Sequence, residues 1–221
     1  MTDLFYRWPK AARFGRAVPK TKFYERGTLT TAVREKFVAQ VRRIMWAFKL
    51  AESTTNLSGS TAVPEIQVFQ IDAKGDDVAE SVLAAIDKAV KTPIIFEVIH
   101  GDERGRQVRM TAAYKRVGIG TPKLSAYYTT GWQPEDAERR PLPTAITLPV
   151  LYMTLLEPLT PVSARPGEEV SDVAARLEAV GKLERDVASL ERKLRTEPQL
   201  NRRVEIRRAL RTKQSELEQQ R

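Results

Sequence analysis

Residues 65–99, EIQVFQIDAKGDDVAESVLAAIDKAVKTPIIFEVI, carry the pattern that decides the fold. Residues 65–71 are rich in β-branched and other apolar side chains, which predicts a strand. An apolar residue then returns every four positions over residues 78–90, which predicts a helix that ends before Pro93. Residues 94–99 are almost continuously apolar, as a central strand is. A strand, a helix and a second strand in this order form a crossover, so we expect the two strands to be parallel.

The segments on either side of this crossover predict the rest of the domain. The turn-forming residues 101–105 and the alternating residues 108–114 predict a hairpin and a return strand, and residues 124–130 predict one more strand. Residues 30–50 predict a helix, because their apolar side chains recur at spacings of three and four. We therefore expect an α+β fold with a small mixed four-stranded sheet, the β-α-β crossover and flanking helices.

The chain divides into four parts of different composition. Residues 1–29 are a basic arm that contains several aromatic side chains, and residues 30–157 are the α+β domain. Prolines mark residues 158–167 as a linker. Residues 168–221 repeat apolar side chains at spacings of four and three, which predicts a helical hairpin or a short coiled coil. We expect the tail to pack against another helix, which is its own second arm, a second copy of the chain in a homodimer, or a partner protein. The candidate partner contacts form an apolar stripe of Leu183, Val187, Leu190, Leu194, Ile206 and Leu210.

The composition of the 221-residue chain excludes several classes of site. It contains no cysteine and one histidine, His100. A disulfide, a zinc ribbon, an iron–sulfur cluster and a multi-histidine metal site are therefore excluded, and we expect no metal and no cofactor. No phosphate-binding GxxxxGK[ST] loop is present, which argues against ATPase activity. No apolar run approaches the roughly 20 residues of a membrane span, and no secretory signal is evident, so a cytoplasmic protein is expected.

The net charge of +9 is unevenly distributed. Residues 1–50 contain 12 Lys and Arg against 3 Asp and Glu, an excess as large as that of the whole chain. Such asymmetry predicts an acidic partner, DNA or RNA. The cations would bind its phosphates, and the aromatic rings would stack on unpaired bases. In a second interpretation the aromatic side chains pack on the core and the cations stay in water. The candidate nucleic-acid contacts are Arg7, Lys10, Arg13, Arg16, Lys20, Lys22, Phe23 and Tyr24.

A nuclease site is a weaker hypothesis. Asp72-Ala73-Lys74 has the (D/E)xK spacing in which a carboxylate holds Mg²⁺ and a lysine stabilises developing charge. Glu97 on the neighbouring predicted strand would supply a second carboxylate. The spacing is short, however, and occurs by chance in many charged proteins. Asp72 is equally well explained as a strand-end residue that starts the turn through Gly75.

Several collinear blocks resemble a bacterial family, the domain of unknown function numbered 4391. The blocks are 18–25 (VPKTKFYE), 44–50 (IMWAFKL), 65–69 (EIQVF), 86–89 (IDKA), 93–96 (PIIF), 113–116 (AYKR) and 199–206 (QLNRRVEI). The resemblance covers nearly the whole chain. It implies a gene that lies beside helicases and DNA methyltransferases, in cassettes that look like phage defence or restriction–modification. It implies no catalytic residue.

Three hypotheses about function follow. In the first, the chain is a non-catalytic accessory subunit of such a defence system, which binds nucleic acid through the basic arm and a helicase through the helical tail. In the second, it is a Mg²⁺-dependent nuclease that uses Asp72, Lys74 and Glu97. In the third, it is a structural adaptor in which only the tail binds a partner. We favour the first.

Overall fold

The crossover expected from residues 65–99 is present in the computed structural model. β4 (Ile66–Ala73) leads into α4 (Glu80–Ala89), which leads into β5 (Ile94–His100). β4 and β5 are parallel, with Ile71 opposite Val98. The structure describes residues 5–26, 29–102, 105–116, 121–165 and 167–221, without the side chains of residues 24–26.

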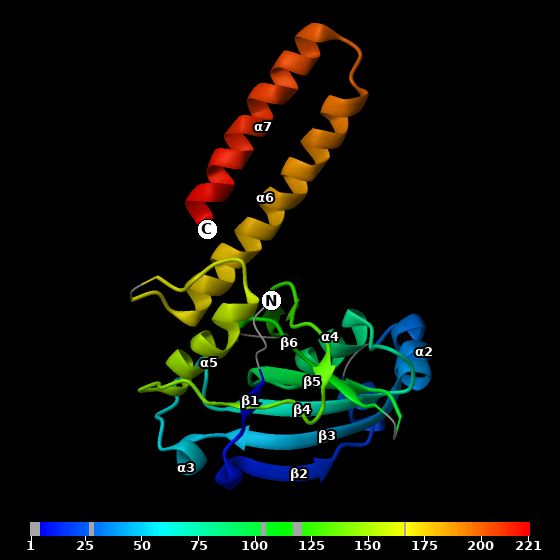
Figure 1. Ribbon diagram of the computed structural model, residues 1–221, viewed down its shortest axis with the longest axis vertical. Coiled ribbons are helices and arrows are strands. Elements are labelled where there is room, and N and C mark those ends of the chain that lie inside the picture. Colours follow the sequence, from blue (N-terminus) through cyan, green and yellow to red (C-terminus); the bar gives the residue numbers. More distant parts are fainter. Residues whose placement is uncertain (1–4, 27–28, 103–104, 117–120, 166) are drawn as a thin grey trace.

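A mixed sheet of seven strands lies at the centre of the described part of the chain (Figure 1). The sequence predicted four strands, and the predicted hairpin is the antiparallel pair of β5 and β6. The predicted strand over residues 124–130 is divided between two short strands, one of which belongs to a separate pair. The order is β10 (Gln133–Pro134), β6 (Gln107–Ala112), β5, β4, β3 (Val41–Leu50) and β2 (Arg13–Ala17), with β9 (Tyr128–Thr129) also beside β6.

The helix expected over residues 30–50 is wrong in its second half. α2 (Thr31–Gln40) is followed directly by β3. β3 is buried at every third residue, at Val41, Ile44, Ala47 and Leu50, and its pairing with β4 shifts register twice. A register shift of this kind interrupts the alternation of side chains along a strand. The two shifts therefore give β3 the three-residue spacing that is typical of a helix.

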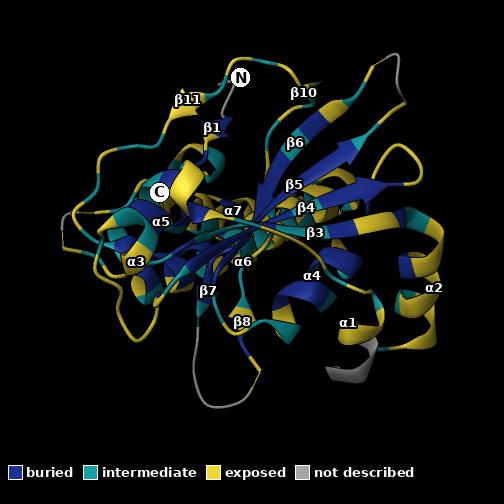
Figure 2. Cartoon of the chain, turned by 90° about the horizontal axis from the view of Figure 1, so that it is seen from below, coloured by how far each residue is buried: buried dark blue, intermediate teal, exposed yellow. Residues whose placement is uncertain are grey.

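Helices cover both faces of the sheet and enclose two cores. On one face, α1 (Thr21–Arg26), α2 and α4 lie together, as Figure 2 shows, over a core that includes Phe37, Phe69 and Phe96. On the other face, α5 (Leu148–Leu156) and the N-terminal segment pack on Val68 and Ile95. The N-terminal segment contains β1 (Tyr6–Arg7) and η1 (Lys10–Ala12), so much of the predicted arm is part of the fold.

The tail is a helical hairpin whose base belongs to the domain. α6 (Val170–Thr196) and α7 (Leu200–Gln220) pack together, and Leu210 and Leu217 of α7 are buried. The first turns of α6, through Val173 and Leu177, are part of the core beneath α5. Beyond these turns, the hairpin projects away from the sheet (Figure 1).

Short elements complete the described chain. α3 (Glu52–Thr55) follows β3, and η2 (Glu157–Leu159) follows α5. β1 pairs with β11 (Arg140–Pro141), and β7 (Lys115–Arg116) pairs with β8 (Lys123–Leu124). Among the described helices, none has the length and apolar character that a membrane span requires.

Candidate nucleic-acid interface

Most aromatic side chains of the predicted arm are core residues. Phe5, Tyr6 and Trp8 are buried in the core beneath α5. Phe23 is buried on the opposite face of the sheet, where its ring stacks on Phe37 with centroids 6.2 Å apart. For these residues the second interpretation of the arm is confirmed, since the aromatic rings hold the N-terminal segment on the domain. Phe14 differs because it lies on the edge strand β2 and is half-buried.

The candidate cations of the arm do not form one surface. Arg13 lines a groove on one side of β2 and Arg16 lines a groove on the other, as expected from the alternation of side chains along a strand. The exposed Lys10 joins Arg13, and the exposed Lys22 of α1 joins Arg16. Four of the candidate cations are therefore divided between two separate grooves.

Two further candidate cations lie outside both grooves. The guanidinium of Arg7 donates to the carbonyl oxygen of Arg139 at 3.3 Å. The ammonium of Lys20 donates to the carbonyl oxygen of Val41, so it holds the start of α1 against β3. Tyr24 is in α1, and its side chain is outside the described part of the structure.

The larger groove, which we call the aromatic groove, has a volume of about 770 Å³ and lies at the edge of the sheet. Its walls are β2, the start of α1, and the loop between α4 and β5, and its floor belongs to β3 and β4. The residues that give it chemical character are Phe14, Arg16, Lys22, Trp46, Phe69 and Lys91. The volume is typical of ligand-binding clefts.

Three aromatic rings line the aromatic groove, Phe14 on its β2 wall and Trp46 with the buried Phe69 on its floor. The ring of Phe14 lies 4.0 Å from that of Trp46, measured between centroids, and is inclined by 37°. Trp46 and Phe69 are nearly parallel, with centroids 6.0 Å apart and an interplanar angle of 8°. The indole N–H of Trp46 is buried and makes no hydrogen bond to any described residue. The rings come from three adjacent strands, so the sheet itself sets their spacing.

Positive charge surrounds this floor. The guanidinium carbon of Arg16 lies 4.8 Å from the centroid of the Phe14 ring, a cation–π contact, while Lys22 and Lys91 are exposed. Among the described residues that line the groove, the one carboxylate is that of Glu65, whose charge is matched by Lys49 at 2.5 Å. An aromatic floor below cations is suited to a planar base that carries phosphate.

The smaller groove, of about 420 Å³, is lined by both polar and apolar side chains. Gln70 and Trp8 line it, and both donate hydrogen bonds to the buried Glu97, at 2.9 and 2.8 Å. Arg139 Nη1 lies 2.6 Å from the same carboxylate. The carboxylate of Glu97 is therefore held by three donors. These contacts join β5 to the N-terminal segment through Trp8 and to the residue that precedes β11 through Arg139.

The three nuclease candidates are not arranged as one site. Asp72 forms ion pairs with Arg43 at 2.7 Å and Arg106 at 3.1 Å, and Glu97 is bound as described above. The ammonium of Lys74 donates to the carbonyl oxygen of Val38 at 2.7 Å. No group of three or more potential metal ligands is found among the described residues. The structure thus pairs Asp72 with two arginines and Glu97 with one, and directs Lys74 to the end of α2.

A buried ion pair supports one wall of the aromatic groove, and the sequence analysis missed it. Lys115 and Asp87 have completely buried side chains in direct contact. The ammonium also donates to the carbonyl oxygens of Asp87 and Val90, each at 2.9 Å, and of Thr92 at 2.7 Å, which caps the carboxyl end of α4. Tyr127 donates its hydroxyl to Asp87 at 2.8 Å. Val90 and Thr92 line the groove, so Lys115 positions this wall from behind.

Burial and pairing act in opposite directions on this pair. Burial raises the pKa of the Asp87 carboxyl and lowers the pKa of the Lys115 ammonium, while the contact between them favours the charged form of each. Four acceptor oxygens surround an ammonium with three protons, so the geometry favours the charged lysine. In the sequence, Asp87 and Lys115 both fall in blocks that carry the family resemblance, and this was the signal that could have identified them.

Comparison with known proteins places the chain in a family. No curated protein matches it, and no solved structure matches it. The family model DUF4391, described as a domain of unknown function, matches residues 7–217, so the chain belongs to this family.

Proposed function

We propose that this protein is a nucleic-acid-binding accessory subunit that takes unpaired bases into the aromatic groove. The observation that carries the proposal is the pair of half-buried rings of Phe14 and Trp46, backed by the buried ring of Phe69, beside Arg16 and the exposed lysines of the groove. Stacking of a base on an aromatic ring contributes about 1–3 kcal/mol and tolerates any base. Cations beside the rings would bind the phosphates on either side of the stacked base.

A single strand is the expected ligand of the groove because the faces of paired bases are covered by their neighbours in a duplex. A single strand presents both a base face and flanking phosphates to a groove at the edge of a sheet. A helicase produces such strands, and it is the partner class that the family resemblance implies. The proposed setting is therefore a phage-defence or restriction–modification system in which this chain holds a strand that a helicase has separated.

Fluorescence anisotropy with labelled single strands tests this function. Wild-type protein is expected to bind with an affinity that falls as salt rises, at a log–log slope near −0.7 for each phosphate that is neutralised. Arg16→Gln with Lys22→Gln is expected to weaken binding and to flatten that slope. The matched control is Lys36→Gln with Arg42→Gln, which removes two exposed cations outside the groove and should leave binding unchanged.

Trp46 provides a second, more local readout. Stacking of a base on its indole should quench tryptophan fluorescence when the oligonucleotide is added. Trp46→Phe keeps an aromatic floor, so it should retain most of the affinity and lose that part of the quench. Absence of single-strand binding at low salt, or a quench that is the same in Trp46→Phe, would contradict the proposed site.

A further inference from the structure

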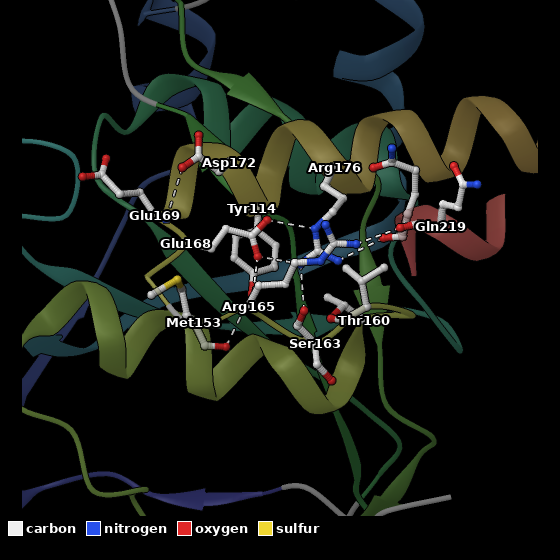
Figure 3. Close-up of polar contacts among 12 residues, drawn as sticks. Tyr114, Met153, Thr160, Ser163, Arg165, Glu168, Glu169, Asp172, Arg176 and Gln219 are labelled. Carbon is white, nitrogen blue, oxygen red and sulfur yellow. Dashed lines mark hydrogen bonds and ion pairs between the residues drawn. The ribbon is translucent and has the colours of Figure 1, made fainter. Parts of the chain in front are cut away.

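A buried arginine connects the linker to both helices at the base of the tail. Arg176 of α6 is 6% exposed and forms a bidentate pair with Glu168, with distances of 2.8 and 2.6 Å (Figure 3). It also donates to the carbonyl oxygens of Ser163 at 2.7 Å and of Gln220 at 3.0 Å. One side chain thus joins the linker, α6 and the last residues of α7. The hairpin is held at its base and extends outward from that point.

The apolar stripe of the tail is used largely within the hairpin itself. Leu210 is buried, and the other five residues predicted to bind a partner are half-buried. Leu183 lies beside α7 in a crevice between the two helices. The large apolar side chains that remain exposed on the hairpin are Leu200 and Val204, near its tip. The outer surface of the tail is therefore mainly polar and charged.

Charge is sharply divided along the hairpin. The distal half, residues 191–213, contains nine Lys and Arg against three Asp and Glu. The remainder of the tail, residues 168–190 and 214–221, contains four against eight. The net charge of the whole tail conceals this division, because the acidic residues near the foot of the hairpin offset the cations near its tip. The fold brings the cations of both helices to one end of the molecule (Figure 1).

Eight of the nine cations of the distal half form no ion pair with the described residues. Lys213 pairs with Glu216 at 2.6 Å. The other eight are exposed and form no ion pair with any carboxylate in the described ranges, and they are Arg192, Lys193, Arg195, Arg202, Arg203, Arg207, Arg208 and Arg211. Seven of the eight are arginine, whose planar guanidinium binds phosphate oxygens in pairs.

We propose that the distal half of the hairpin is a second nucleic-acid-binding surface, which contacts the phosphates of a double helix. Residues 191–213 contain no Phe, Tyr or Trp, so this surface offers no ring for base stacking. It differs in this respect from the aromatic groove. The helical part from Leu200 to Lys213 is about 21 Å long at 1.5 Å per residue. A duplex presents a phosphate charge about every 1.7 Å along its axis, so several arginines can be matched at once.

The test uses the full chain and a blunt duplex without single-stranded ends. The distal variant carries Arg202→Gln, Arg203→Gln, Arg207→Gln, Arg208→Gln and Arg211→Gln, with glutamine chosen because it preserves helix propensity. Duplex affinity at low salt should fall at least tenfold, and the salt slope should become shallower by about 0.9 for each phosphate that is no longer neutralised. Circular dichroism should show unchanged helix content, because all five side chains are exposed.

Two controls separate this surface from the aromatic groove. Lys182→Gln with Arg185→Gln neutralises exposed cations in the proximal half and should leave duplex affinity unchanged. Arg16→Gln with Lys22→Gln alters the groove and should also leave blunt-duplex affinity unchanged. Duplex affinity that is the same in the folded distal variant as in wild type, or absence of duplex binding at low salt, would overturn the proposal. Selective binding of an acidic polypeptide in place of the duplex would overturn it too.

Discussion

The side chains of Lys115 and Asp87 form a completely buried ion pair at the carboxyl end of α4. The pair links β7 to α4, and the same ammonium binds three carbonyl oxygens around the loop that precedes β5. That loop is a wall of the aromatic groove. A strong local interaction in the core is therefore connected directly to the shape of the candidate binding site.

Removal of the lysine should be strongly destabilising. Lys115→Met leaves Asp87 without its countercharge in a buried position, and it leaves the carbonyl oxygens of α4 without a donor. We expect the free energy of unfolding to fall by about 3–5 kcal/mol, measured by chemical denaturation. Lys115→Met combined with Asp87→Leu should lose less than the sum of the two single changes, because no unpaired charge remains. A loss below about 1 kcal/mol in Lys115→Met would show that the pair does not stabilise the fold.

Acid should loosen the base of the tail. The hydrogen bonds from Arg176 lower the pKa of the Glu168 carboxyl from its ordinary value. A carboxyl whose pKa is lower in the folded state stabilises the fold above its ordinary pKa, and this contribution is lost as the pH falls through the folded pKa. Protease cleavage within residues 158–167 should therefore become faster at a pH below about 4.5.

Glu168→Gln is the matched variant for this effect. It keeps the size of the side chain and removes its charge, so cleavage of the linker should already be faster at neutral pH and should change less on acidification. The same pH response in Glu168→Gln and in wild type would assign the acid effect to other carboxyl groups.

The nuclease alternative makes a different prediction about Asp72. Its carboxylate lies between Arg43 and Arg106, which neutralise the charge that would attract Mg²⁺. Asp72→Ala should therefore leave any Mg²⁺-dependent cleavage in a purified sample unchanged, as followed on labelled single and double strands. Loss of cleavage in Asp72→Ala, together with unchanged binding, would favour the nuclease.

Sequence patterns predicted the elements whose apolar residues keep one regular spacing along their length. The crossover through residues 65–99 and the helical hairpin fall in this class, since uninterrupted apolar spacing reflects their burial directly. β3 does not belong to this class. Its two register shifts replace the alternating burial of a regular strand with burial at every third residue. Local spacing cannot distinguish such a strand from a helix, and the distinction came from pairing with β4 and β2.

The candidate sites were less accessible to sequence reasoning for a related reason. Arg13 and Arg16 are close in the chain, yet the edge strand separates them into different grooves. Trp46 lines the aromatic groove because β3 is a strand that lies next to β2. Lys91 lines it because the loop that follows α4 forms one of its walls. The arginines of α7 can be read directly from the sequence. The net charge of the whole tail is nevertheless small, because acidic residues near the foot of the hairpin offset them.

The two proposed surfaces lie at opposite ends of the molecule, with β2 at one end of its long axis and the tip of the hairpin at the other (Figure 1). A nucleic acid that contacts both surfaces at once must therefore combine a duplex with a single strand of sufficient length. Binding at the second surface then becomes intramolecular, which raises affinity only when the connecting strand can span the distance.

A duplex with single-stranded extensions of increasing length tests this relationship by anisotropy. Short extensions should bind no more tightly than the blunt duplex, and affinity should rise once the extension reaches the aromatic groove. Arg16→Gln with Lys22→Gln should remove the rise and leave duplex binding, whereas the distal variant should leave single-strand binding. A gradual increase from the first nucleotide, equal in wild type and in the groove variant, would show that the extension adds only nonspecific phosphate contacts.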